Sequence, residues 1–78
     1  MSENIYPSRI SIRSPEQLGD AVARSRKIKG YSQQEFADLA GVGRRFVSDL
    51  ENGKPTAEIG KVLQVLTALG LDLELRAR

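Results

Sequence analysis

Hydrophobic positions recur with a helical period through the middle of the chain and with a strand period only towards its two ends. The small and apolar residues of the first helical stretch recur every three or four positions: Leu18, Ala21, Val22 and Ser25. Ser14 and Gln17 match a capping box before this stretch, and Pro15 suits the first turn of a helix, while Gly30 suits the end of one. We therefore predict a first helix over residues 15–29.

Two much shorter helices follow, separated by Gly41, Val42 and Gly43. Ser32 and Glu35 match a second capping box, which predicts the start of the first of them. Its expected inner face consists of three residues: Phe36, Leu39 and Ala40. Tyr31 precedes the cap and is placed to pack on Phe36 as a hydrophobic staple.

The next helix should begin at Gly43 or Arg44 and stop at Gly53. Successive residues of a helix are about 100° apart, so the apolar residues of this stretch fall on one side: Phe46, Val47 and Leu50. The opposite arc collects polar residues: Arg44, Arg45, Ser48, Asp49 and Asn52. The sequence thus predicts one buried and one exposed face.

Pro55 ends that helix, and a fourth helix is predicted after it. Apolar residues occupy much of the circumference of this fourth helix: Ile59, Val62, Leu63, Val65, Leu66 and Leu69. This wide apolar arc predicts that the helix contributes both to the core and to an interface with a second subunit. Gly60 inside it predicts a close approach of another element, because glycine costs about 1 kcal/mol in a helix relative to alanine.

Strand-like alternation is confined to the ends. Residues 71–75 alternate apolar and acidic side chains, which predicts a C-terminal strand within the tail of residues 71–78. Residues 10–13 give a weaker signal within an N-terminal arm of residues 1–13. The C-terminal strand is expected to pair with residues 10–13 or with its copy in a second subunit, where Leu71, Leu73 and Leu75 would be buried across a two-fold axis.

Composition narrows the functional classes. The chain has 78 residues, enough for one small domain, which we place at residues 14–70. It contains neither cysteine nor histidine, which excludes disulfides, thiolate nucleophiles and the usual zinc ligands. We expect no enzyme, metal, cofactor or small-molecule substrate. A carboxylate site formed by Asp20, Glu35 and Asp38 is rejected, because Glu35 serves as a cap and the others lack a basic partner.

The net charge is only +2, from 12 basic and 10 acidic residues, so any nucleic-acid binding depends on where the charges lie. No signal peptide or long apolar run is visible, and we expect a cytoplasmic, nucleoid-associated protein without a membrane partner.

Two short helices around a tight turn are typical of a helix-turn-helix, whose second helix enters the DNA major groove with its N-terminal residues leading. Arg44 and Arg45 hold those leading positions, and arginine can donate two hydrogen bonds to guanine. Ser48 can contact a base or a phosphate, and Asn52 is expected nearer the DNA backbone. Asp49 either accepts from cytosine or holds Arg45, its neighbour one turn away. Double-stranded DNA is the expected partner.

Residues 32–54 resemble the XRE or Cro/repressor-type helix-turn-helix, whose pattern "SQ-x-E-[LF]-A-x-x-[AL]-G-V" followed by "V-S-x-[LW]-E-N-G-K" reads here "SQQEFADLAGV" and "VSDLENGK". The resemblance implies an all-α, lambda-repressor-like domain of four to five helices. The wider chain, from "IRSPEQLGDAVARSRKIKGYSQ" to "GKPTAEIGKVLQVLTALGLDLEL", resembles antitoxin-like regulators of the HipB type.

The resemblance also implies roles for single residues. The base-contacting positions would be Arg44, Arg45, Ser48 and Asp49. The backbone-contacting positions would be Gln33, Gly43, Asn52 and Lys54. Arg26 and Glu51 match a pair that forms a salt bridge between the first and third helices. Gly43 departs from the family pattern, which has serine or threonine there, so one hydroxyl contact to DNA is lost.

The expected function is repression of the protein's own operon by a homodimer bound to a near-palindromic operator. The HipB-type resemblance implies a further partner, a HipA-like kinase toxin. The alternatives are a free-standing prophage-type repressor and a protein-binding adaptor that has lost DNA binding.

Overall fold

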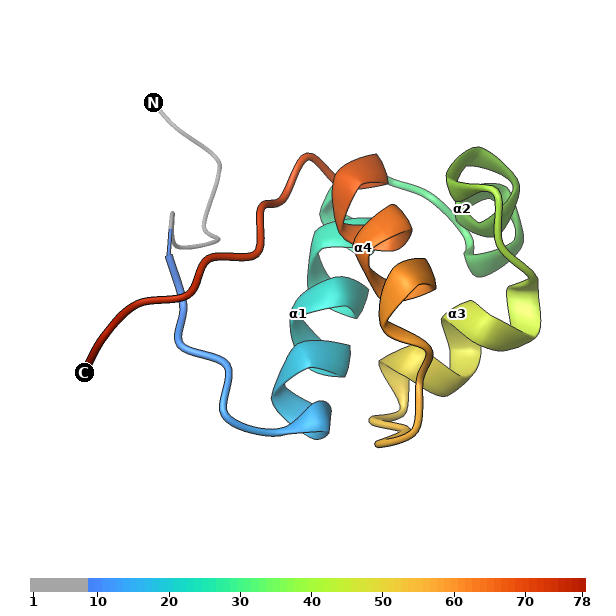
Figure 1. The fold of residues 1–78 in the computed structure, drawn as a ribbon. Helices are drawn as coiled ribbons and strands as arrows, with labels where there is room; N and C mark the ends of the chain where they lie inside the picture. The colour runs from blue at the N-terminus through green and yellow to red at the C-terminus, as the bar shows by residue number, and fades with distance from the viewer. Residues whose placement is uncertain (1–8) are drawn as a thin grey trace, which may run out of the picture.

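The computed structural model describes residues 9–78, so most of the N-terminal arm expected at residues 1–13 lies outside the described part. The described chain forms four α-helices, shown in Figure 1: α1 Pro15–Ile28, α2 Gln33–Ala40, α3 Arg44–Glu51 and α4 Ile59–Ala68. The predicted all-α helix-turn-helix fold is confirmed. None of the helices within residues 9–78 is both long and apolar enough to span a membrane.

The starts of the first two helices follow from local side-chain chemistry. The Ser14 hydroxyl accepts the backbone N–H of Gln17 at 3.1 Å, whereas the Gln17 side chain accepts from the N–H of Arg13 rather than from that of Ser14, so only half of that capping box forms. At α2 both halves form: Ser32 N–H donates to the Glu35 carboxylate at 2.9 Å, and Glu35 N–H donates to the Ser32 hydroxyl at 3.0 Å.

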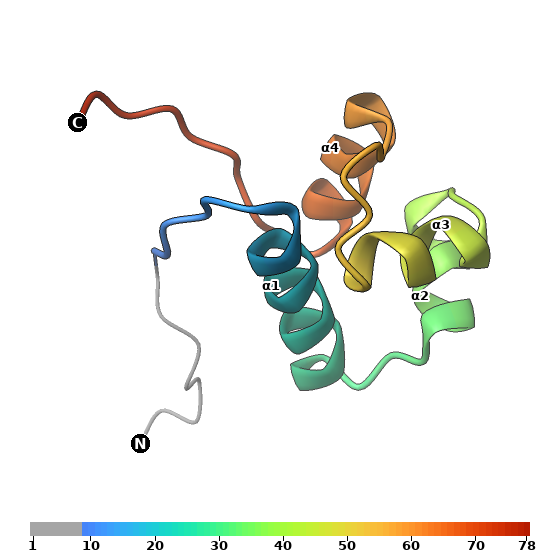
Figure 2. The same ribbon diagram turned by 90° about the horizontal axis from the view of Figure 1, so that it is seen from below.

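A single hydrophobic core lies between the helices. Its buried members come from all four helices and the end of α4: Val22, Phe36, Ala37, Val47, Leu50, Val62, Val65, Leu66 and Leu69. Helix α3 packs on α1 and α2, and α2 also packs on α4. The Tyr31 ring lies 6.2 Å from that of Phe36, centroid to centroid, as expected for the staple. Helix α3 is thus held on its inner side while its outer side stays free (Figure 2).

Two packing predictions were wrong. Leu39 is exposed, and Ala37 is buried beside Phe36 in its place. At about 100° per residue, Ala37 and Ala40 fall on one side of Phe36 and Leu39 on the other, and the side of α2 turned to the core is the one with Ala37, which leaves Leu39 outside it. Gly60 is also exposed: a Cβ atom there would meet only the carboxylate of Glu58, at 2.7 Å, and no other helix.

The close approach occurs instead at Gly19, which is buried on α1. A Cβ atom at this position would lie 2.4 Å from the carbonyl oxygen of Leu50 and 2.8 Å from that of Glu51. Both carbonyls belong to the last turn of α3, whose backbone cannot give way as a side chain would. Gly19 therefore sets how near α3 lies to α1.

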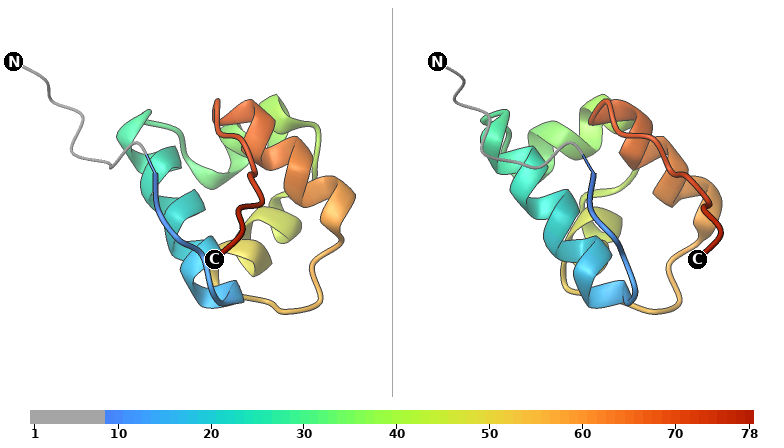
Figure 3. Two further views of the ribbon diagram at one scale, coloured as in Figure 1. Left: turned by 60° about the vertical axis from the view of Figure 1, so that its left-hand side comes forward. Right: turned by 90° about the vertical axis from the view of Figure 1, so that its left-hand side faces the viewer.

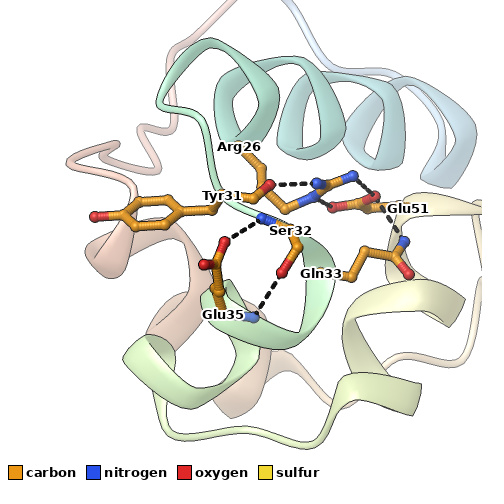
Figure 4. Close-up of polar contacts among 6 residues, drawn as sticks. All are labelled: Arg26, Tyr31, Ser32, Gln33, Glu35 and Glu51. Atoms are coloured by element: carbon orange, nitrogen blue, oxygen red, sulfur yellow. Dashed lines mark hydrogen bonds and ion pairs between the residues drawn. The ribbon is translucent and has the colours of Figure 1, made fainter.

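An ion pair fastens the same two helices. Arg26 Nε lies 2.7 Å from Glu51 Oε2, and Arg26 Nη2 donates to Glu51 Oε1 at 3.0 Å, while Nη1 donates to the carbonyl of Tyr31 at 2.7 Å (Figure 4). The two side chains are only 8% and 6% exposed. The hydrogen bond to Glu51 raises the pKa of Arg26, because it favours the charged guanidinium more than burial disfavours it.

No strand forms within residues 9–78, so the predicted pairing of the C-terminal segment with residues 10–13 is absent from the chain. The two segments run apart in the right-hand view of Figure 3. A lone strand needs a partner for its backbone N–H and C=O groups, and each short segment lacks one here. Leu71 packs partly on the core, but Leu75 is 95% exposed. Pairing between two subunits stays a prediction.

Replacing Gly19 with alanine is expected to lower the free energy of unfolding by about 1–3 kcal/mol, because the new methyl group must push α3 away from α1. Gly60→Ala is the matched control, since both glycines are helical but the second faces solvent; it should be neutral or stabilising by up to about 1 kcal/mol. Urea unfolding followed by circular dichroism at one protein concentration measures both. Equal effects of the two substitutions would contradict the close approach at Gly19.

Removing one partner of the buried ion pair between Arg26 and Glu51 should lower the free energy of unfolding more than Gly19→Ala does. Glu51→Ala leaves the Arg26 charge buried without its counter-ion and is expected to cost about 3–5 kcal/mol of unfolding free energy. The double variant Arg26→Met, Glu51→Leu should be more stable than Glu51→Ala, because no unpaired charge remains. Urea unfolding of the two variants tests this, and a cost of Glu51→Ala below about 1 kcal/mol would show that the pair does not hold α1 to α3.

Candidate nucleic-acid interface

The turn between α2 and α3 gives α3 its orientation. Gly41 ends α2 in the left-handed region, with φ 77°, and its N–H and that of Val42 both donate to the carbonyl of Ala37, at 2.9 and 3.1 Å. Val42 then packs against the core. The chain re-enters helix at Arg44, which begins the first turn of α3, and α3 lies below α2 in the view of Figure 1.

Arg44 and Arg45 extend from this first turn into solvent, and the Arg45 side chain is 90% exposed. Val47 and Leu50 on the opposite side are buried, which fixes the rotation of the helix about its axis. Two cations at a helix N-terminus oppose the helix dipole. Helix stability therefore does not explain the two arginines, whereas an anionic ligand such as DNA does.

Gln33 lies at the start of α2 and is tied to α3. Its side-chain Nε2 donates to Oε1 of Glu51 at 3.0 Å (Figure 4). The other N–H of the carboxamide and its oxygen remain available to a ligand, next to the backbone N–H groups of Gln33 and Gln34, which begin α2 and have no intrahelical acceptor. One carboxylate, that of Glu51, thus joins α1, α2 and α3.

Sequence reasoning placed Gln33 and Glu51 in separate roles and missed the bond between them. The two residues are 18 positions apart, and no helical or strand spacing connects such positions. The only available signal was chemical: a carboxylate can accept about four hydrogen bonds, so a single arginine does not saturate it.

Asp49 lies between two cations on the exposed side of α3. Its Oδ1 is 3.6 Å from Arg45 Nε, and its Oδ2 is 3.6 Å from Nζ of Lys54. Of the two roles that the sequence left open for Asp49, the chain without DNA contains the pairing with Arg45. Ser48 is half-buried, and Asn52 and Lys54 are exposed at the far end of the helix.

Gly43 is the N-cap of α3, and no side chain caps this helix. Its φ of −77° is open to any residue, and nothing lies within 4 Å of an added Cβ atom. The serine or threonine expected by resemblance would therefore fit, so the glycine is not required by the backbone.

The rejected carboxylate set does not assemble. Glu35 is committed to the Ser32 cap, and Asp38 accepts a hydrogen bond from Gln34 at 3.0 Å. Within residues 9–78 no group of three or more histidine, cysteine or acidic side chains is arranged to hold a metal ion.

Comparison with known proteins places these features in a family. Residues 22–75 match the family model described as helix-turn-helix. The uncharacterized HTH-type transcriptional regulator y4mF of Sinorhizobium fredii (strain NBRC 101917 / NGR234) is 52% identical over 66 residues, which cover 85% of this chain and 87% of that protein.

Several solved structures are also similar, among them these three. The HipB-O4 20mer complex and the HipA-HipB-O2-O3 complex each contain a chain that is 28% identical, with a TM-score of 0.80 over 88% of this chain and 97% of that one. The restriction-modification controller protein C.AhdI from Aeromonas hydrophila is 29% identical, with a TM-score of 0.67 over 74% of this chain and 84% of that one. The chain belongs to the XRE-type helix-turn-helix family and is a DNA-binding transcriptional regulator.

Proposed function

We propose that the protein is a sequence-specific repressor that inserts the first turn of α3 into the DNA major groove. The observation that carries this proposal is the placement of Arg44 and Arg45, both exposed at the leading end of a helix whose inner face is locked into the core. A guanidinium there can donate to O6 and N7 of guanine. Ser48, one turn further, would add a base contact.

Phosphates on either side would fix the register of α3 in the groove. Gln33 lies at the N-terminus of α2, where the helix dipole and free N–H groups favour an anion. Its bond to Glu51 means that a phosphate held by Gln33 also positions α3. Asn52 and Lys54 would contact the backbone beyond the other end of α3, and Gly43 would allow close approach of a phosphate at its start.

A homodimer on a near-palindromic operator is the assembly we infer. Leu73 and Leu75 are exposed on an extended segment, which leaves them available to the same segment of a second copy. Residues 71–78 run along the side of the molecule away from α2 and α3 (Figures 1 and 2), so pairing there leaves the arginines free. Two recognition helices would then enter major grooves about 34 Å apart or a multiple of that distance.

A kinase of the HipA type is the second partner that we propose, with the protein acting as the antitoxin of the pair and repressing its own operon. The support is the likeness to HipB, which occurs in a HipA-HipB-O2-O3 complex. We propose no catalytic role, since the sequence has neither histidine nor cysteine.

Arg45→Ala is expected to weaken binding to an operator by about 1–3 kcal/mol while hardly changing binding to random DNA, because a base contact carries sequence information. Lys54→Ala should weaken binding to both duplexes and reduce the salt slope by about 1, because a phosphate contact is the same on every DNA sequence. Fluorescence anisotropy on a duplex enriched from a random library measures both. Equal losses on both duplexes for Arg45→Ala would mean that it reads no base.

The antitoxin proposal predicts that a reading frame for a HipA-type kinase adjoins the gene and that its product binds this protein. Co-expression followed by size-exclusion chromatography should give one complex that still binds the operator. A neighbouring kinase that elutes separately, or the absence of any such reading frame, would leave a free-standing repressor.

A further inference from the structure

Asp49 is the one acidic side chain of α3 that lies on its exposed side, and it faces two cations at once. Each of its carboxylate oxygens lies 3.6 Å from a different partner, Arg45 Nε for Oδ1 and Lys54 Nζ for Oδ2. Both cations belong to the surface that the proposed function places against DNA. The carboxylate would therefore stand within the DNA interface as a fixed negative charge.

The backbone holds Asp49 beside Lys54. Helix α3 ends in a Schellman motif, in which Lys54 N–H donates to the carbonyl of Asp49 and Gly53 N–H to that of Leu50, each at 3.0 Å. Gly53 has φ 84° and lies so close to α1 that an added Cβ atom would be 3.1 Å from Cα of Glu16. The position of Lys54 relative to Asp49 is thus set by the packing of α3 on α1.

Helix stability gives no reason for an acidic residue at this position. Asp49 lies in the last turn of α3, where the helix dipole disfavours a negative charge. Glu51 in the same turn is compensated by the buried Arg26, but the partners of Asp49 are exposed and such pairs contribute little to folding. Since folding does not account for Asp49, we look for its role in DNA binding.

The ion pairs of Asp49 with Arg45 and Lys54 affect a contact to guanine and a contact to a phosphate differently. The atom of Arg45 nearest Asp49 is Nε, so the terminal Nη1 and Nη2 groups remain free to donate to guanine. A phosphate approaching Arg45 or Lys54 instead meets the Asp49 carboxylate, which repels it and already neutralises part of their charge. Guanine carries no net charge, so the carboxylate repels its O6 and N7 acceptors much less than it repels a phosphate.

We propose that Asp49 is a specificity-determining residue, which orients Arg45 for guanine and weakens the attraction of Arg45 and Lys54 for DNA phosphates. The inference rests on the proposed function, because it takes Arg45 as a base contact. It assigns Asp49 an action on its neighbours in place of the cytosine contact considered from sequence.

Asp49→Asn tests the inference, because it removes the charge and keeps the shape. The variant should bind a random duplex about three- to tenfold more tightly, with a salt slope steeper by about 1, as two cations become available to phosphates. Asp20→Asn is the matched control, with the same change in net charge at an exposed position of α1, outside both α3 and the segment proposed to form the dimer. Asp49→Glu, which keeps the charge, should behave like the unchanged protein.

Anisotropy titrations on a random duplex and on the duplex enriched by the unchanged protein give the ratio of the two affinities, which should fall at least threefold for Asp49→Asn alone. Random-duplex binding that matches the Asp20→Asn control would overturn the inference. So would a loss of discrimination confined to a single C·G pair, which would make Asp49 a cytosine reader. Failure to enrich any duplex counts against the proposed function instead, and the random-duplex titration still decides the role of Asp49.

Discussion

The carboxylate of Glu51 is the group on which the arrangement of the first three helices depends. It accepts from Arg26 on α1 and from Gln33 on α2 while belonging to the last turn of α3. Taking this ion pair out of water is costly, so it stabilises the fold only because its hydrogen bonds are satisfied, including the one from Arg26 to the Tyr31 carbonyl. The approach of α1 to α3 at Gly19 brings the two partners within reach.

This arrangement determines what the outer surface can do. With α3 fixed on its inner side, its first turn presents Arg44 and Arg45 on the outer side of the molecule, and the bond from Gln33 to Glu51 sets the place of Gln33 relative to α3. A net charge of only +2 is enough for DNA binding, because the position of the basic groups on this surface matters more than their number. In this view Asp49 lowers the attraction for DNA in general and so raises the share of binding that depends on sequence.

Much of the fold could be predicted from the chain because its signals are local. The cap of α2, the turn at Gly41 and the apolar face of α3 each depend on residues a few positions apart. The errors concern contacts between distant segments. The close packing at Gly19 and the bond from Gln33 to Glu51 depend on how whole helices meet, and no spacing reports that. Strand pairing of the tail depends on a partner that one chain does not supply.

The central claim is that this fixed surface reads a particular DNA sequence. The most direct measurement is fluorescence anisotropy of a labelled fragment from immediately upstream of the protein's own gene, titrated at two salt concentrations beside a scrambled duplex of the same length. Salt-sensitive binding that favours the native fragment by about a hundredfold or more is the result the account predicts, given that specific sites exceed random DNA by about a thousandfold or more in this class of complex. Equal, weak binding to both duplexes would contradict it.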